Sequence, residues 1–166
     1  MTPEFALATL KALIPDYEQE RATTVKTLDA LPDSGADYRP DPKSRTALEL
    51  SFHVGYGEKW FLEGCVNGGF GEWKEEMPAG MKPSQVSAWY LKETDLVLAK
   101  VKEMTGEQAA KIVDFMGAFQ LPAVVFFTWA VKHTVHHRGQ LTAYLRAAGG
   151  KVPAIYGGSA DEEWKG

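Results

Sequence analysis

Four long stretches of helical sequence pattern, separated by segments rich in proline and glycine, constrain the fold of this chain more than any other feature. Within each stretch apolar residues recur at three- and four-residue steps, the spacing that places them on one face of an α-helix. Four helices of this length in a chain of 166 residues predict an all-α four-helix bundle. We expect helices at about residues 3–31, 46–66, 83–104 and 121–148.

Proline and glycine also shape the segments around these helices. Pro15 lies inside the first stretch, where its missing amide hydrogen predicts a kink or a restart. The connection between the second and third helices is long enough for a crossover along the bundle, and its part from Gly68 to Gly80 could be a mobile flap or a solvated crossover. Lys111–Gln120 alternates just enough to form a loop or a minor strand.

Charge and composition exclude several classes of protein. The chain has 18 basic and 22 acidic residues and no run of Lys and Arg, so we expect no nucleic-acid partner. Its longest apolar stretch, residues 123–131, is too short to cross a bilayer, so we expect no membrane partner. A single cysteine, Cys65, suits a reducing compartment. We therefore expect one cytoplasmic domain, residues 1–166, whose core is large enough to fold without a metal.

Two histidines of the last helix have the spacing of metal ligands. His133 and His137 are one turn apart and about 40° apart on the helical wheel, in the middle of the apolar face. His136 falls at the edge of that face, where a surface role is expected. His53, the fourth histidine of the chain, lies in the middle of the second helix and also faces inward.

Buried imidazoles cost free energy unless their ring nitrogens find partners. The ordinary interpretation is that carboxylates and waters satisfy each ring separately. A divalent ion held jointly by His53, His133 and His137 explains all three inward positions at once, and we expect such a site. Cys65 is a poor fourth ligand, because twelve helical residues place it about 18 Å along the axis from His53.

Glu49 lies one turn before His53 on the same side of the helix, and it is the candidate catalytic residue. It could ligate the ion, hold a ring N–H or accept a proton. Three histidines alone would leave an open coordination position, as in catalytic zinc sites. Four aromatic residues could form a pocket around that position or belong to the core: Tyr56, Trp60, Trp129 and Tyr144.

The run His133-Thr-Val-His-His-Arg-Gly-Gln-Leu141, together with His53 and the tail Val152–Gly157, resembles the DinB-like (YfiT-like) family of four-helix-bundle metal proteins. The resemblance implies an up-down-down-up bundle, a homodimer, and nickel or zinc held by His53, His133 and His137. It also implies a low-molecular-weight thiol cofactor in those relatives that act as S-transferases or isomerases with bacillithiol or mycothiol. Other relatives have no assigned reaction.

Two further residues of this run have positions that suggest a role. Arg138 can pair with a carboxylate of a neighbouring helix, and Gln140 borders the histidine pair and could orient a ligand. The second helix is apolar nearly all round, which is expected of a helix covered on both sides. We therefore predict a homodimer through this helix and part of the fourth. The residues that suggest it are Leu48, Phe52, Val54 and Leu62.

The function that these observations predict is that of a metal-dependent transferase, of the thiol S-transferase type, or of a hydrolase with a small-molecule substrate. In this hypothesis the metal activates water or a substrate thiolate, and Glu49 accepts a proton. The alternative is a non-catalytic, metal-binding, stress-associated dimeric bundle. A third, weaker hypothesis is a metal-free bundle that functions through dimerisation alone.

Overall fold

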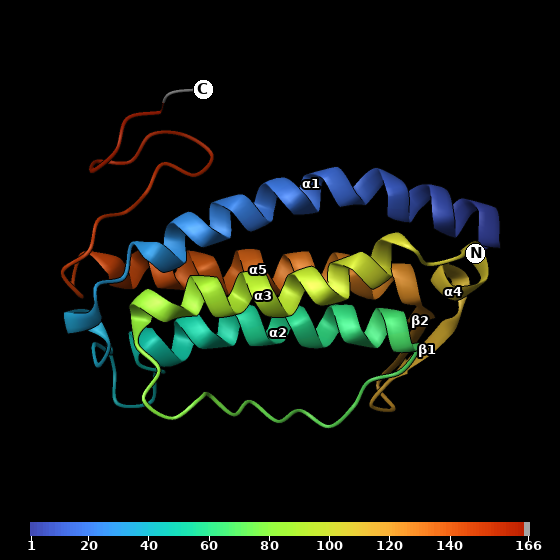
Figure 1. Cartoon of the computed structure of the whole chain (residues 1–166), viewed down its shortest axis with the longest axis horizontal. Coiled ribbons are helices and arrows are strands. Elements are labelled where there is room, and N and C mark those ends of the chain that lie inside the picture. Colours follow the sequence, from blue (N-terminus) through green and yellow to red (C-terminus); the bar gives the residue numbers. More distant parts are fainter. Residues whose placement is uncertain (165–166) are drawn as a thin grey trace.

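The computed structural model describes residues 1–164, so the last two residues of the expected domain lie outside the described part. Four long helices lie side by side (Figure 1). Helices α2 and α3 run in one direction and α1 and α5 in the other, which confirms the up-down-down-up bundle. The helices are α1 (Pro3–Asp29), α2 (Ala47–Asn67), α3 (Pro83–Lys102), the short α4 (Gly106–Ala110) and α5 (Ala123–Leu145), with a 3-10 turn at Asp33–Gly35.

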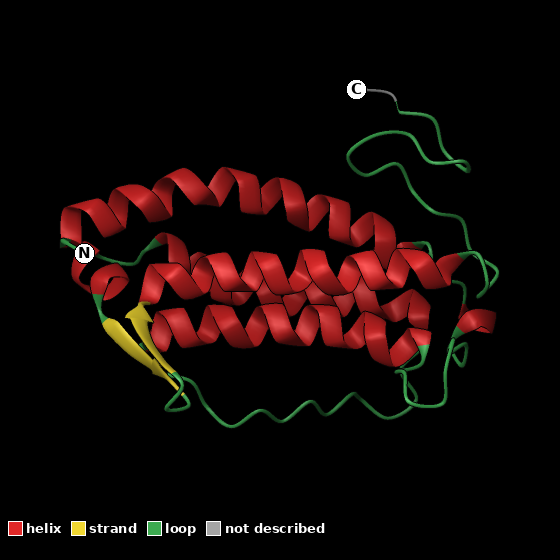
Figure 2. Ribbon diagram, turned by 180° about the vertical axis from the view of Figure 1, so that it is seen from behind, coloured by secondary structure: helices red, strands yellow, loops and turns green. Residues whose placement is uncertain are grey.

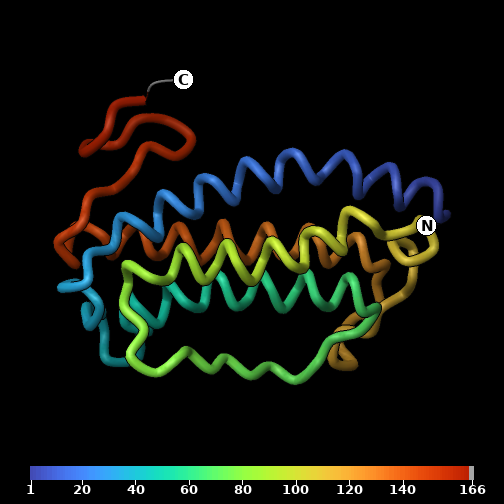
Figure 3. Tube along the Cα trace, in the orientation of Figure 1, coloured from blue at the N-terminus to red at the C-terminus, as the bar shows by residue number. Residues whose placement is uncertain are grey.

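The predicted crossover between α2 and α3 runs back along the length of the bundle (Figure 3). Gly68 ends α2 with a φ of 63°, a left-handed conformation that glycine adopts without strain. Two hydrogen bonds then hold the crossover to α2. The indole of Trp60 donates to the carbonyl of Gly71, and the backbone N–H of Lys74 donates to the hydroxyl of Tyr56.

Helix α1 continues without a break from Pro3 to Asp29, so the expectation of a restart at Pro15 is wrong. Leu10 and Tyr17, on either side of the proline, are both buried and hold the flanking turns against the same core. Packing of this kind outweighs the loss of one backbone hydrogen bond. Figure 1 shows α1 as a bowed helix.

The segment Lys111–Gln120, for which the sequence allowed a loop or a minor strand, forms most of an antiparallel hairpin at one end of the bundle (Figure 2). Its strands are β1 (Ile112–Phe115) and β2 (Phe119–Pro122). The short helix α4 before it is too brief for a periodic pattern to reveal it. Helix α5 ends at Leu145, earlier than predicted, because the chain already turns between Arg146 and Gly149.

A buried carboxylate joins all four long helices. Glu58 on α2 is only 1% exposed and accepts hydrogen bonds from one hydroxyl on each of the other three helices. The distances are 2.6 Å from Tyr17 on α1, 2.8 Å from Tyr90 on α3 and 2.7 Å from Thr134 on α5. Because hydrogen bonds are directional, these contacts fix how α2 lies against its neighbours.

Arg138 pairs with a carboxylate of a neighbouring helix, as the sequence suggested. Its guanidinium, buried in the bundle, lies 2.6 Å from Glu20 on α1 and also donates to the hydroxyl of Thr24. A third contact reaches the hydroxyl of Tyr156, which in turn bonds to Glu20. This group therefore ties α5 and the C-terminal segment to α1.

The apolar residues that suggested a dimer are mostly covered within one chain. Phe52, Val54 and Leu62 are buried, and Leu48 is half-buried. The apolar surface of α2 therefore no longer supports a homodimer, which remains a prediction. Across residues 1–164, none of the helices combines the length and the apolar character that a membrane crossing requires.

Candidate metal centre

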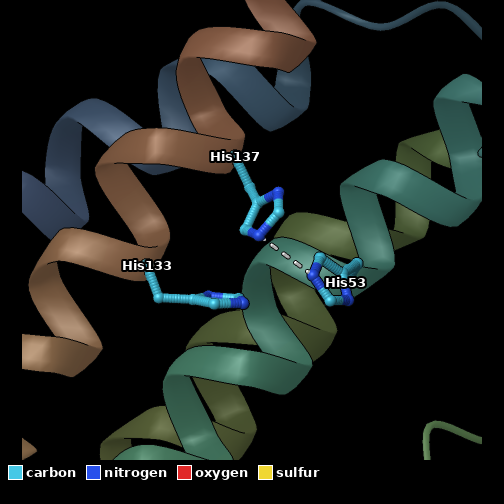
Figure 4. A group of neighbouring side chains, drawn as sticks. All are labelled: His53, His133 and His137. Carbon is cyan, nitrogen blue, oxygen red and sulfur yellow. Dashed lines mark hydrogen bonds between the residues drawn. The ribbon is translucent and has the colours of Figure 1, made fainter.

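The structure brings together the three histidines that the sequence singled out. His53 projects from α2, and His133 and His137 project toward it from adjacent turns of α5 (Figure 4). Each ring offers one nitrogen to a group in which all three atoms lie within 4.8 Å of one another. Nε2 of His53 and Nε2 of His137 are 3.2 Å apart.

Gly57 makes room for this group on α2. A Cβ atom at residue 57 would overlap Cε1 of His133, so the ring lies directly against the glycine backbone. Any larger residue would push the ring away from His53. Gly57 precedes Glu58, and Thr134 follows His133, so the hydrogen bond between Glu58 and Thr134 fixes α2 against α5 beside the cluster.

The crossover supplies a carboxylate to the cluster. Both oxygens of Glu75 lie 3.0 Å from Nδ1 of His53. The same carboxylate accepts from the guanidinium of Arg45 at 3.2 Å and from the indole of Trp73 at 3.3 Å. The crossover therefore takes part in the site through Glu75. This contact argues against both earlier alternatives, a mobile flap and a crossover that contacts only solvent.

Glu75 determines which nitrogen of His53 carries the proton. Burial alone would raise the pKa of Glu75, but the hydrogen bond with His53 and the charges of His53 and Arg45 outweigh it, so the pKa lies below its usual value. An ionised carboxylate can only accept hydrogen bonds. Nδ1 of His53 is therefore the donor, and in the neutral ring Nε2 carries a free lone pair.

Gln140 orients the ring of His137 as Glu75 orients the ring of His53, through a hydrogen bond at Nδ1. Its side-chain oxygen lies 2.8 Å from Nδ1 of His137, and its side-chain nitrogen lies 3.2 Å from Nε2 of His136. The amide thus accepts from His137 and donates to His136. Nδ1 of His137 carries the hydrogen, and Nε2 of this ring also presents a lone pair.

When both rings are neutral, two lone pairs face each other across 3.2 Å, an arrangement that is repulsive unless a cation lies between them. Two imidazole nitrogens bound to one tetrahedral ion at about 2.0–2.1 Å each lie about 3.3 Å apart. The separation and the protonation pattern of His53 and His137 therefore both fit a divalent ion that prefers nitrogen ligands.

His133 completes the group from a more buried position. Burial, followed by repulsion from His137 and His53 when those rings are protonated, lowers its pKa to about 3, so the ring stays neutral at ordinary pH. Its Nδ1 is buried and has no hydrogen-bond partner among residues 1–164. Burial also lowers the pKa of His137. Neutral imidazole is the form that binds metal, so protons compete weakly at these two rings.

The predicted catalytic residue Glu49 lies outside the histidine group. Its carboxylate accepts from the backbone N–H of Thr46 at 2.7 Å and closes a capping box at the start of α2. It also lies 3.9 Å from Arg39 and is half exposed. The carboxylate that contacts His53 is that of Glu75. Periodicity could not identify Glu75, because this residue lies in an irregular segment with several acidic residues.

Three cavities adjoin or approach the cluster. One of about 280 Å³ is lined by Phe61, Trp129, Lys132, His133, His136 and His137. A second, of about 390 Å³, lies on the other side of His137, and Tyr144 forms part of its wall. Of the aromatic residues left open between pocket and core, Trp129 and Tyr144 line cavities. Trp60 is buried in the core, and the Tyr56 hydroxyl bonds to the crossover.

A third cavity, of about 570 Å³, is lined by both Glu49 and Glu75. The cluster itself contains three possible ligands, with no fourth His, Cys, Asp or Glu among the residues that the structure describes. An ion held by these three rings would therefore have room for a further, non-protein ligand.

Replacing Glu75 with glutamine is expected to weaken nickel or zinc binding by about tenfold. The amide keeps the shape and one acceptor oxygen but loses the charge that orients His53, and loss of such a partner costs about 10–100-fold. Calorimetric titration of the metal-free protein measures the change. Glu76→Gln is the matched control, since Glu76 is exposed in the same segment. Equal affinities in the two variants would contradict the assigned role.

A model of the DinB family matches residues 8–165 of this chain. An uncharacterised protein of Bacillus subtilis (strain 168), YrdA, is 26% identical over 157 residues, which cover 94% of this chain and 92% of that protein.

Two crystal structures of DinB-like proteins are similar in fold. A protein from Bacillus cereus aligns with a TM-score of 0.74 and 28% identity over 88% of this chain and 97% of its own. The YjoA protein of Bacillus subtilis aligns with a TM-score of 0.68 over 96% and 99% of the two chains. At 17% identity, this second likeness concerns the fold alone.

Proposed function

This chain belongs to the DinB family, and from that premise we propose that it is a metal-dependent transferase of the thiol S-transferase type or a hydrolase. In this proposal His53, His133 and His137 hold a divalent ion, nickel or zinc. The substrate is a small molecule, and a low-molecular-weight thiol serves as co-substrate if the reaction is S-transfer.

The observation that carries the proposal is the pair of facing Nε2 atoms of His53 and His137, 3.2 Å apart. Glu75 and Gln140 occupy the opposite nitrogen of each ring, so both lone pairs are directed at one point. Carboxylate–histidine partnerships of this kind are a recurrent feature of metal sites. Without an ion, one Nε2 would have to carry a proton so that one ring donates to the other.

A bound divalent ion would supply Lewis acidity toward a water or a thiol at its open position. The chain's own groups contribute orientation and shielding. Glu75 holds the ring of His53, and Phe61 and Trp129 add apolar surface to the cavity beside the cluster. Glu49 stays in the proposal as a candidate proton acceptor because it lines the same cavity as Glu75.

Two assays of metal-loaded protein test this proposal. One follows transfer of a small thiol to an electrophile, and the other follows hydrolysis of small esters, each with nickel and with zinc. We expect one of the two reactions to require the metal and to be lost in His53→Ala. His136→Ala is the comparison variant: this exposed ring lies outside the three-histidine group, although it contacts Gln140 and lines the adjoining cavity, so metal binding should be kept.

Stoichiometric metal binding without turnover in either assay would favour the alternative, a non-catalytic metal-binding bundle. Absence of nickel and zinc binding by the intact chain would overturn both. The assays should use the full chain, since the C-terminal segment is tied to α1 through Arg138 and Tyr156.

A further inference from the structure

A cavity beside the histidine cluster is lined by two basic residues, which bears on the charge of the substrate. The cavity of about 390 Å³ is lined by His137 and Gln140 together with Lys43 and Arg45. Leu50 and Tyr144 add apolar surface. None of the described residues that line this cavity is acidic. Its volume falls within the range of about 300–1,000 Å³ that is typical of small-molecule sites.

Arg45 is exposed, but its guanidinium has a partner in the site. Its guanidinium donates to Glu75, whose carboxylate also bonds to His53, so a continuous chain of contacts runs from the cavity wall to the cluster. Arg45 presents five N–H donors, and one carboxylate oxygen of Glu75 uses only part of them. The remaining donors are free to bind a further oxyanion.

Lys43 supplies a second positive charge. Its side chain lines the cavity, and among residues 1–164 its ammonium has no acidic partner within salt-bridge distance. The segment that carries it is fixed, because the backbone N–H groups of Lys43 and Ser44 both bond to Asp41. A lysine and an arginine that line the same cavity favour an oxyanion through charge-assisted hydrogen bonds.

We propose that the substrate of the metal site carries an oxyanion, a carboxylate or a phosphate, that binds Lys43 and Arg45 in this cavity. The rest of the molecule lies over Leu50 and Tyr144, and its reacting group is directed toward His137. This inference rests on the proposed function for the identity of the reacting centre, whereas the anion cavity stands on its own residues.

The test measures binding of three probes that share one ring. Benzoate carries a carboxylate, phenyl phosphate carries a phosphate, and benzamide is uncharged. Calorimetry with nickel-loaded and with metal-free protein, in buffer with about 0.15 M salt, gives each affinity. We expect at least one anionic probe to bind about tenfold or more tightly than benzamide. The tighter of the two anions identifies the substrate class.

Two charge-removing variants locate the binding. Lys43→Gln should weaken the anionic probes by about tenfold and leave benzamide and nickel affinity unchanged. Lys132→Gln is the matched control, because Lys132 lines the cavity of about 280 Å³ together with His133 and His137 and does not line the cavity that contains Lys43. Arg45 is less suitable for this comparison because it contacts Glu75.

Three results would overturn the proposal: equal affinity for anionic and neutral probes, no effect of Lys43→Gln, or an equal loss in Lys132→Gln. An equal loss in Lys132→Gln would mean that the positive charge of the surface attracts anions in general and that the cavity is not a specific anion site. A chain that binds no nickel but still prefers an anion through Lys43 would refute the proposed metal function and support the anion cavity. The two proposals therefore fail separately.

Discussion

Replacing His137 with alanine is expected to lower the affinity for nickel or zinc by more than about a hundredfold and to leave the chain helical. Loss of a partner outside the ligand set already costs about 10–100-fold, and loss of a ligand costs more. The fold should persist because a bundle of this size buries enough apolar surface to be stable alone. The variant also removes one of the two facing lone pairs.

Metal titration, circular dichroism and thermal melts decide this prediction. His136→Ala should keep far more of the metal affinity than His137→Ala, because this neighbouring exposed ring is outside the group and reaches His137 only through Gln140. A His137→Ala chain that unfolds at room temperature, or a wild-type chain that unfolds when a chelator removes its metal, would mean that the site is structural. The proposal of catalysis would then lose its main physical support.

Periodicity predicted the four long helices because each buries a continuous face over five or more turns. It failed where a few residues decide the structure. The five residues of α4 show no repeat, and Pro15 suggested a break that the buried neighbours Leu10 and Tyr17 prevent. The end of α5 depends on a local turn before Gly149 rather than on a long pattern.

The histidine cluster could be predicted because ligand spacing and an inward face are both visible in the sequence. The partners of those histidines divide into two kinds. Gln140 lies on the same helix as His137, so its approach follows from a three-residue step. Glu75 reaches His53 from an irregular segment 22 residues away, and only the path of the crossover makes them neighbours. Glu49 was assigned from helical spacing, which could not reveal that the carboxylate caps its own helix.

Glu58 could not be singled out from sequence, yet its removal is expected to be among the most damaging changes. Glu58→Ala should lower the free energy of unfolding by at least about 3 kcal/mol, because three buried hydroxyls lose their acceptor and a cavity remains. Urea denaturation measures the loss. Glu63→Ala on the same helix is the matched control, since its contact with Lys59 is exposed and worth less than about 1 kcal/mol.

The triple variant Glu58→Leu, Tyr17→Phe, Tyr90→Phe keeps the prediction testable if the alanine variant does not fold. It removes the acceptor together with two of its donors, so most of the lost stability should return. A triple variant as unstable as Glu58→Ala would indicate that shape, and not unsatisfied hydroxyls, causes the loss. Wild-type stability in Glu58→Ala itself would contradict the role of Glu58 as a link between helices.

The pH dependence of stability provides an independent test of the same carboxylate. Burial raises the pKa of Glu58 above its usual value of 4.5, although the hydrogen bonds from Tyr17, Thr134 and Tyr90 oppose this shift. A raised folded-state pKa adds stability that is complete below the unfolded-state pKa and is lost as pH rises through the folded-state pKa. The free energy of unfolding of the wild type relative to Glu58→Gln should therefore fall above about pH 4.5, by at most about 1.4 kcal/mol per pH unit. A difference that stays constant from pH 4 to 8 would mean that the hydrogen bonds balance the cost of burial, and one that grows with pH would mean that they outweigh it. Either result would contradict the raised pKa.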